Sequence, residues 1–303
     1  MKKWGTNRQQ LFFLALLGFI FIFIFCYVPM FGIVLAFKDG DYVMDIAKAM
    51  FETDWVGLDN FKNFLTDPEF LNVVRNTLGL NILSLIFTFP LPIIFALFIN
   101  EFQSSAYKKT IQTISYFPYF LSWVVFGGIV LAILDPQTGV LNGVMLKLGI
   151  IDKAINFGTA EYFWGLMIIT AIIKGVGWGS IIYVAAISGV DSAIYESAEL
   201  DGAGRFTKMW YITLPSITPT ITVFLIMSIS GILNSGFEQT WIFQNQMNLD
   251  TSELIDTYVY KYGVLNMRYS YATAIGLLKS VLALILLWSG NRTSKKITGE
   301  GIF

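Results

Sequence analysis

The sequence predicts an all-α membrane protein with six transmembrane helices, and three observations lead to this fold class. Hydrophobic residues make up 55% of the chain and charged residues only 14%, whereas a soluble domain usually has about 25% charged residues. Six apolar runs are each long enough to cross a bilayer. The polar segments between the runs differ in their content of Lys and Arg from one side to the other.

The six apolar runs have lengths of about 20 residues, which is the length that crosses the hydrocarbon core as a helix. They cover residues 11–37, 76–100, 114–134, 162–188, 212–233 and 272–288. Backbone groups in lipid must bond within their own segment, so each run is expected to be helical. The β-branched and aromatic residues do not favour strands at these lengths.

The first run follows a basic start with Lys2, Lys3 and Arg8, as a signal peptide would. Its apolar stretch is much longer than the core of a signal peptide and lacks a small-residue cleavage pattern. We therefore expect it to be retained as a transmembrane helix.

The distribution of Lys and Arg predicts the orientation of the chain. The N-terminus, the 101–112 loop, the 191–210 loop and the C-terminus are the short, basic segments, which places them in the cytoplasm. The predicted organisation is a cytoplasmic segment over 1–10, a six-span domain over 11–290 and a cytoplasmic tail over 291–303. Between the first two spans, residues 59–65 are amphipathic and predict either a short helix at the outer membrane interface or a solvated connector.

Several kinds of chemistry are excluded by composition. The chain has no His, which removes imidazole catalysis and His metal ligands, and its single Cys26 allows no disulfide or thiolate cluster within the chain. A Walker A pattern is absent. We therefore expect no catalytic residues, no metal site and no cofactor in this chain.

A polar island over 196–205 interrupts the membrane pattern between the fourth and fifth runs. Asp191 or Ser192 is a candidate cap for a helix beginning near Ala193, and Gly202 is a candidate for its end. Small residues share one face of this helix, which fits two alternatives equally: a face that binds a partner, or a loop helix that lies on the membrane surface. Pro215 is expected to open the next membrane helix, where its missing N–H costs little.

The island resembles the signature loop of bacterial ABC importer permeases. That loop reads E-A-A, three residues, G, nine residues, then I-x-L-P, and the residues that fit are Glu196, Ala198, Gly202, Ile212, Leu214 and Pro215. Ser197 replaces the second Ala. Further segments resemble the subfamily that handles polysaccharides and complex oligosaccharides: 27–39, 75–77, 89–92, 112–118, 177–183 and 256–260.

The resemblance implies a type I ABC importer permease fold, in which this loop forms a coupling helix seated in a groove of a cytoplasmic ATPase. It assigns the coupling contact to Glu196, Ala198, Asp201, Gly202, Ala203, Leu214 and Pro215. It also implies that ATP and Mg are bound by the partner ATPase dimer and that an extracellular solute-binding protein delivers the carbohydrate. A second, homologous permease completes the pathway, with a heterodimer favoured.

Two lysines, Lys174 and Lys279, fall near the middle of predicted spans, where ionisable residues are expensive and often functional. Neither has an acid at helical spacing in its own span. Each either faces a translocation cavity, where it would attract an anionic sugar, or bonds to backbone carbonyls or polar groups of a neighbouring helix. The second interpretation is the favoured one.

Sugar contacts are predicted for aromatic and amide or carboxylate side chains on the fourth span and at the outer end of the fifth. These residues are Trp178, Tyr183, Asn234, Glu238, Gln239 and Trp241. Interfacial belts also use Tyr and Trp. Pro90, Pro92 and Pro118 predict kinks in the second and third spans.

Two other classes of protein compete with an ABC permease. An ion-driven transporter would show inverted repeats and acids within the spans, and neither is found. An intramembrane enzyme would need a nucleophile and a base, and no such pair stands out in the spans.

Overall fold

The computed structural model describes residues 3–102, 104–233 and 236–298. These residues are almost entirely helical and fall into two compact units. The first unit holds the chain up to Pro68 together with Val259–Leu278, and the second holds Glu69–Tyr258 and the chain from Lys279 onward.

The first unit begins with a long apolar helix. It consists of α1 (Lys3–Ile22), a π-helical turn over Phe23–Tyr27, α2 (Val28–Met30) and a 3-10 helix over Phe31–Phe37. The part from Arg8 to Phe37 is long and apolar enough to cross a membrane, which agrees with the run predicted over 11–37. The remaining helices of this unit are α3 (Ile46–Phe51), α4 (Asp59–Leu65), the π-helical Tyr260–Leu265 and the start of α17 (Tyr269–Thr298).

The amphipathic segment 59–65 forms α4, which confirms the predicted helix. Asn60 is buried and donates to the carbonyls of Ala36 and Lys38, at 3.1 and 3.0 Å. Phe64 is also buried and meets the Tyr271 ring edge to face. One face of α4 is therefore packed within its own unit, so this segment is not a solvated connector.

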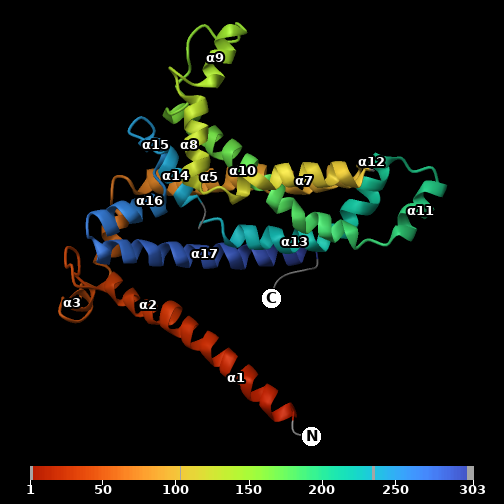
Figure 1. The fold of residues 1–303 in the computed structure, drawn as a ribbon. Helices are drawn as coiled ribbons and strands as arrows, with labels where there is room; N and C mark the ends of the chain where they lie inside the picture. The colour runs from red at the N-terminus through yellow and green to blue at the C-terminus, as the bar shows by residue number, and fades with distance from the viewer. Residues whose placement is uncertain (1–2, 103, 234–235, 299–303) are drawn as a thin grey trace. The chain divides into compact units, whose positions relative to one another are not determined.

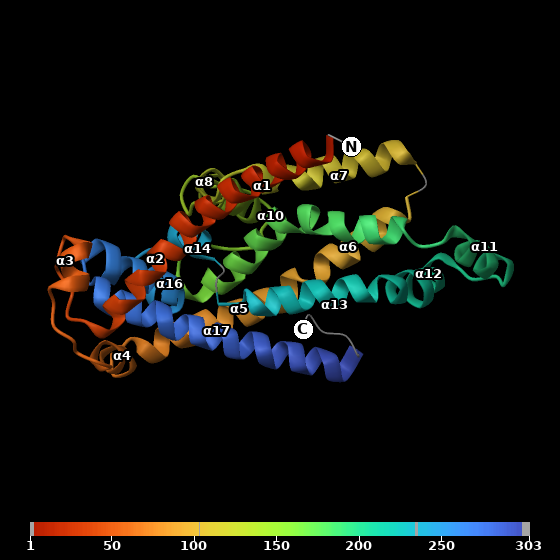
Figure 2. The ribbon, with the colours of Figure 1, turned by 90° about the horizontal axis from the view of Figure 1, so that it is seen from below.

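The second unit is built around α10 (Ala160–Ser188). This helix packs against α5 (Phe70–Thr88), α6 (Pro90–Asn100), α7 (Ser105–Phe120) and α13 (Leu214–Ser230), as Figure 2 shows. Gly177 is what allows α7 so close, because a Cβ added there would lie 2.0 Å from the Ser115 carbonyl oxygen. Small residues have this use where helices pack in membranes. Gly175, two residues earlier, has open space beside it.

The other helices of the second unit are shorter or continue the spans. They are α8 (Trp123–Leu134), α9 (Val140–Lys147), α11 (Ser192–Leu200), α12 (Arg205–Lys208), α14 (Phe237–Phe243), α15 (Leu249–Ser252), most of α16 (Ile255–Val259) and the later part of α17.

The third predicted span is not one continuous helix. Instead of a helix over 114–134, α7 and α8 meet at an angle of 101° (Figure 1). The break lies at Leu121 and Ser122, beyond Pro118, which stays inside α7. Ser122 caps the new helix by accepting from the Val125 N–H at 3.3 Å. Counting this bent pair as one span, the described residues contain six candidate membrane spans.

Prolines act differently in the second and fifth spans. Pro90 and Pro92 stand in the first turn of α6, where the helix restarts after Phe89, and α5 and α6 together form one candidate span. Pro215 stands in the first turn of α13, as predicted, but the candidate span already begins at Arg205 and not at Ile212. A π-helical turn over Met209–Thr213 precedes Pro215, and its wider turn suits a residue that lacks an N–H.

Candidate functional site

The polar island forms α11, whose two ends are fixed as the sequence predicted. At its start, the Asp191 carboxylate accepts from the Ala193 N–H at 3.0 Å. At its end, Gly202 has φ of +79°, and the N–H of Ala203 bonds back to the Ala198 carbonyl at 2.8 Å. This left-handed ending is readily adopted by glycine. The island is therefore an ordered helix and turn.

One side of α11 is open to a partner. The predicted small-residue face, which includes Ala193 and Ser197, is exposed, and Leu200 at its end is 91% exposed. Figure 1 shows α11 beyond the ends of α10 and α12, with no other helix over it. Among the residues assigned to the coupling contact, Glu196, Asp201 and Gly202 are exposed, and Ala198 and Ala203 are half-buried.

Leu214 and Pro215 lie apart from this surface, within the membrane helix that follows. Leu214 packs against a core cluster that contains Ile93 and Ile217, whereas Pro215 is exposed on α13. The end of the signature pattern therefore shapes the helix behind α11 and does not extend the α11 surface.

Two side-chain contacts tie α11 to the start of the fifth span. Glu199 forms an ion pair with Lys208. The hydrogen bond and the positive charge of Lys208 hold the pKa of the Glu199 carboxyl below its usual value. The Tyr195 hydroxyl lies 2.9 Å from the Thr213 hydroxyl. Side chains therefore connect α11 to α12 and to the π-helical turn that leads into α13.

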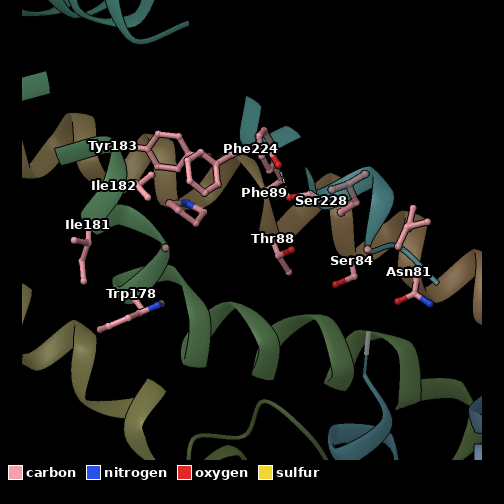
Figure 3. A pocket seen from close by; sticks show the side chains of 15 residues that line it. Asn81, Ser84, Thr88, Phe89, Trp178, Ile181, Ile182, Tyr183, Phe224 and Ser228 are labelled. Carbon is pink, nitrogen blue, oxygen red and sulfur yellow. Dashed lines mark hydrogen bonds between the residues drawn. The ribbon is translucent and has the colours of Figure 1, made fainter. Parts of the chain in front are cut away.

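A cavity of about 620 Å³ lies between α5, α6, α10 and α13 in the second unit (Figure 3). Asn81, Ser84 and Thr88 line it from α5, and their spacing puts them on one helix face. Ser228 adds a hydroxyl from α13. These residues were missed in the sequence, although a polar stripe at helical spacing within an apolar run is a readable signal.

Two of the predicted pathway residues line this cavity, Trp178 and Tyr183. Trp178 is 41% exposed, and its ring is stacked on Tyr119 with centroids 4.6 Å apart and planes at 5°. Tyr183 is 4% exposed and meets the Phe224 ring edge to face. The cavity wall is therefore aromatic on one side and carries hydroxyl and amide groups on the other.

Lys174 does not line the cavity. Its ammonium donates to the carbonyls of Pro118 at 3.2 Å, Tyr119 at 2.9 Å and Leu121, all at the end of α7. The break leaves the Tyr119 and Leu121 carbonyls without continuing helical partners, whereas the Pro118 carbonyl also accepts from the Leu121 N–H at 3.3 Å. A lysine at a helix C-terminus also meets the favourable end of the helix dipole. The favoured interpretation of Lys174, a bond to carbonyls of a neighbouring helix, is the observed one.

Lys279 has a carboxylate partner from a different helix. It forms an ion pair with Asp256 of α16, and the two side chains are 13% and 26% exposed. The sequence showed no acid at helical spacing within the span, because the partner lies 23 residues earlier. Lys279 is thus neutralised by a contact within the second unit.

Three further predicted pathway residues, Glu238, Gln239 and Trp241, lie on α14 and do not line the cavity. Gln239 is buried and donates to the Met167 carbonyl at 2.7 Å and the Thr170 hydroxyl at 2.8 Å. Glu238 and Trp241 are exposed. Asn234 lies outside the described residues. Their predicted contact with a sugar remains a prediction.

Comparison with known proteins identifies the family. A family model described as binding-protein-dependent transport system inner membrane component matches residues 74–299. The chain belongs to this family. The permease resembles Protein LplB of Bacillus subtilis (strain 168), with 42% identity over 97% of this chain and 91% of that protein. It also resembles the polygalacturonan/rhamnogalacturonan transport system permease protein YteP of the same organism, with 40% identity over 98% and 91%.

Solved structures agree with this assignment. The permease superposes on a chain of a bacterial ABC transporter involved in the import of the acidic polysaccharide alginate, with a TM-score of 0.87, 37% identity and coverage of 98% and 100%. A second structure, of a bacterial alginate ABC transporter in complex with an alginate pentasaccharide-bound periplasmic protein, gives a TM-score of 0.86 at 37% identity, covering 100% of each chain. The predicted type I ABC importer fold and the predicted role as a membrane permease subunit are confirmed.

Proposed function

We propose that this permease carries an oligosaccharide or polysaccharide fragment across the cell membrane as one subunit of an ATP-driven importer. The observation that carries the proposal is α11, a capped helix whose small-residue face is open and whose spacing fits the coupling loop of such permeases. The carbohydrate class is supported by the similar proteins, whose names include a polygalacturonan/rhamnogalacturonan permease and an alginate importer.

Energy enters through α11. A separate ATPase dimer binds ATP and Mg and takes the exposed face of α11 into a groove on its surface. Small side chains such as Ala193 and Ser197 permit close backbone approach there. Closure of the ATPase dimer moves α11, and the permease does no bond chemistry itself. This role places α11 and both chain termini, 1–10 and 291–303, in the cytoplasm.

The cavity supplies the carbohydrate contacts. Sugar rings present C–H faces that pack on aromatic rings and hydroxyls that form hydrogen bonds. Trp178, whose ring stacks on that of Tyr119, offers an aromatic face to the cavity. Asn81, Ser84 and Thr88 of α5 offer a row of polar groups to it. Among the described residues that line it, the cavity has no Lys, Arg, Asp or Glu. These described lining residues therefore recognise the sugar by shape and by hydrogen bonds to its hydroxyls.

The pathway is completed by other chains. A second, homologous permease closes the cavity from the other side, and an extracellular solute-binding protein delivers the carbohydrate and sets most of the selectivity. The alginate transporter, whose structure includes a bound periplasmic protein, supports this arrangement. A heterodimer of permeases is the proposed form.

Uptake into vesicles tests the proposal. The permease, its partner permease, the ATPase and the solute-binding protein are reconstituted, and uptake of short oligosaccharides of a uronic acid and of a neutral hexose is followed with and without ATP. We expect ATP-dependent uptake that is lost in Glu196→Lys and retained in Asp152→Lys, an exposed loop substitution. Uptake without ATP, or normal uptake in Glu196→Lys, would contradict the proposal.

A further inference from the structure

The π-helical turn over Met209–Thr213 is an irregularity that the proposed function does not explain. The Leu214 N–H bonds to the Met209 carbonyl, five residues back. Such turns are rare, occur as single interruptions of α-helices and are frequent at functional sites. This one lies in the fifth span, between α11 and the residues of α13 that line the cavity.

The Thr213 side chain closes this turn. It is buried, and its hydroxyl donates to the Lys208 carbonyl at 3.3 Å. A hydroxyl has one proton to donate. The 2.9 Å contact with Tyr195 therefore has the tyrosine as the donor and Thr213 as the acceptor. One end of this bonded chain is in α11, and the other is the backbone at the start of the π-turn.

The inner side of the turn is packed toward the cavity. Met209 and Ile217 are 5% and 1% exposed, and they belong to one buried cluster with Tyr183. Tyr183 also lines the cavity and contacts Phe224 of α13, a second lining residue. Continuous contact therefore runs from Tyr195 through the π-turn to the cavity wall.

We propose that Tyr195 and Thr213 are positioning residues that transmit the movement of α11 to α13 through the π-turn. A π-turn contains about one residue more than the α-helical turn that it replaces. Its conversion to α-helix shifts α13 along and around its axis, and it moves Phe224 and Ser228 in the cavity wall. The Tyr195 hydroxyl couples this conversion to α11. The inference rests on the proposed docking of α11 to an ATPase.

The test removes single hydroxyls and measures carbohydrate uptake and ATP hydrolysis in the same reconstituted vesicles. A neutral hydrogen bond shifts an equilibrium about two- to tenfold. Tyr195→Phe and Thr213→Val are each expected to lower uptake per ATP by about that factor, and the double variant is expected to be no lower than either single variant. Thr213→Ser, which keeps the hydroxyl, and Tyr211→Phe, an exposed tyrosine of the same turn, are expected to keep the wild-type ratio.

Three results would overturn this inference. The first is wild-type uptake per ATP in Tyr195→Phe, and the second is a double variant whose loss of uptake per ATP is the sum of the two single losses. The third is a Tyr195→Phe variant that no longer copurifies with the ATPase. The last would make Tyr195 a docking residue. The outcome is separable from that of the proposed function, which Glu196→Lys tests in the same vesicles. Normal uptake in Tyr195→Phe with loss in Glu196→Lys overturns the transmission alone, whereas normal uptake in both contradicts the docking of α11.

Discussion

Lys174 of α10 donates a hydrogen bond to the backbone carbonyl of Tyr119, 2.9 Å away, at the point where the third span breaks. The same ammonium lies 5.3 Å from the centre of the Trp123 ring. One lysine thus occupies the end of α7 and faces the first turn of α8. The break is held by a cation from a neighbouring helix, in a region where lipid offers the carbonyls no alternative partner.

Lys174→Met is therefore expected to destabilise the permease. The variant removes the charged donor from carbonyls at the end of α7. Because charge-assisted hydrogen bonds are lost, the free energy of unfolding is expected to fall by about 3 kcal/mol. Thermal unfolding of the purified protein in detergent measures the effect, with Lys153→Met, an exposed loop substitution, as the control. Equal melting temperatures for the two variants, combined with lost uptake of anionic sugars, would instead support a lysine that faces the substrate.

The Lys279–Asp256 pair predicts that substitutions at its two positions have non-additive effects on the free energy of unfolding. Lys279→Met leaves the Asp256 carboxylate without its cation and is expected to lower the free energy of unfolding by about 2 kcal/mol. The loss is smaller than for a fully buried pair because Asp256 is 26% exposed. The double variant Lys279→Met with Asp256→Asn removes both charges and is expected to recover part of this loss. Melting temperatures of the four proteins provide the measurement, and strictly additive losses would show that the pair has no coupling.

Trp178→Ala is expected to weaken carbohydrate binding in the cavity. Loss of an aromatic contact worth about 1 kcal/mol raises the half-saturating sugar concentration roughly fivefold, while basal ATP hydrolysis stays unchanged. Trp288→Ala, an exposed tryptophan of α17, is the matched control. A sugar concentration dependence equal to that of the control would remove Trp178 from the pathway.

Thr88→Val tests the polar stripe of α5 without changing side-chain volume much. It removes one hydroxyl from the cavity wall, and we expect a loss of uptake affinity of about two- to tenfold. Thr218→Val, an exposed threonine of α13, serves as the control. If both variants take up sugar with wild-type affinity, Thr88 makes no hydrogen bond to the substrate.

The Glu199–Lys208 contact predicts how the position of α11 depends on pH. The bond and charge of Lys208 lower the pKa of Glu199. The stabilising contribution of the Glu199–Lys208 contact is therefore complete above the pKa that Glu199 has in the unfolded chain. It is lost as the pH falls through the lower pKa that Glu199 has in the folded protein. Uptake per ATP is expected to be insensitive to this group near neutral pH and to fall in Glu199→Gln. A Glu199→Gln variant with the wild-type ratio would show that the ion pair does not position α11.

The sequence alone predicted the spans and the capped helix α11, because membrane length and capping chemistry are local properties. The partners of Lys174 and Lys279 could not be predicted, since they lie on other helices and depend on packing. The break at Ser122 was masked because the residues that flank it are apolar enough to read as one run over 114–134, although α8 is far more apolar than α7 as a whole. Asn81, Ser84 and Thr88 form a readable polar stripe, but their place in the wall of a cavity depends on how α5 packs with α10 and α13.

Cross-linking of α11 to the ATPase reports directly on whether α11 docks there. Cys26 is the only cysteine of the chain, so Cys26→Ser permits single cysteines at Ser197, on the open face of α11, and at Asp152 as a control. With a short bifunctional reagent in the assembled transporter, we predict a cross-link between the ATPase and position 197, altered by ATP, and none from position 152. Absence of any cross-link from position 197 in a transporter that hydrolyses ATP would contradict the account.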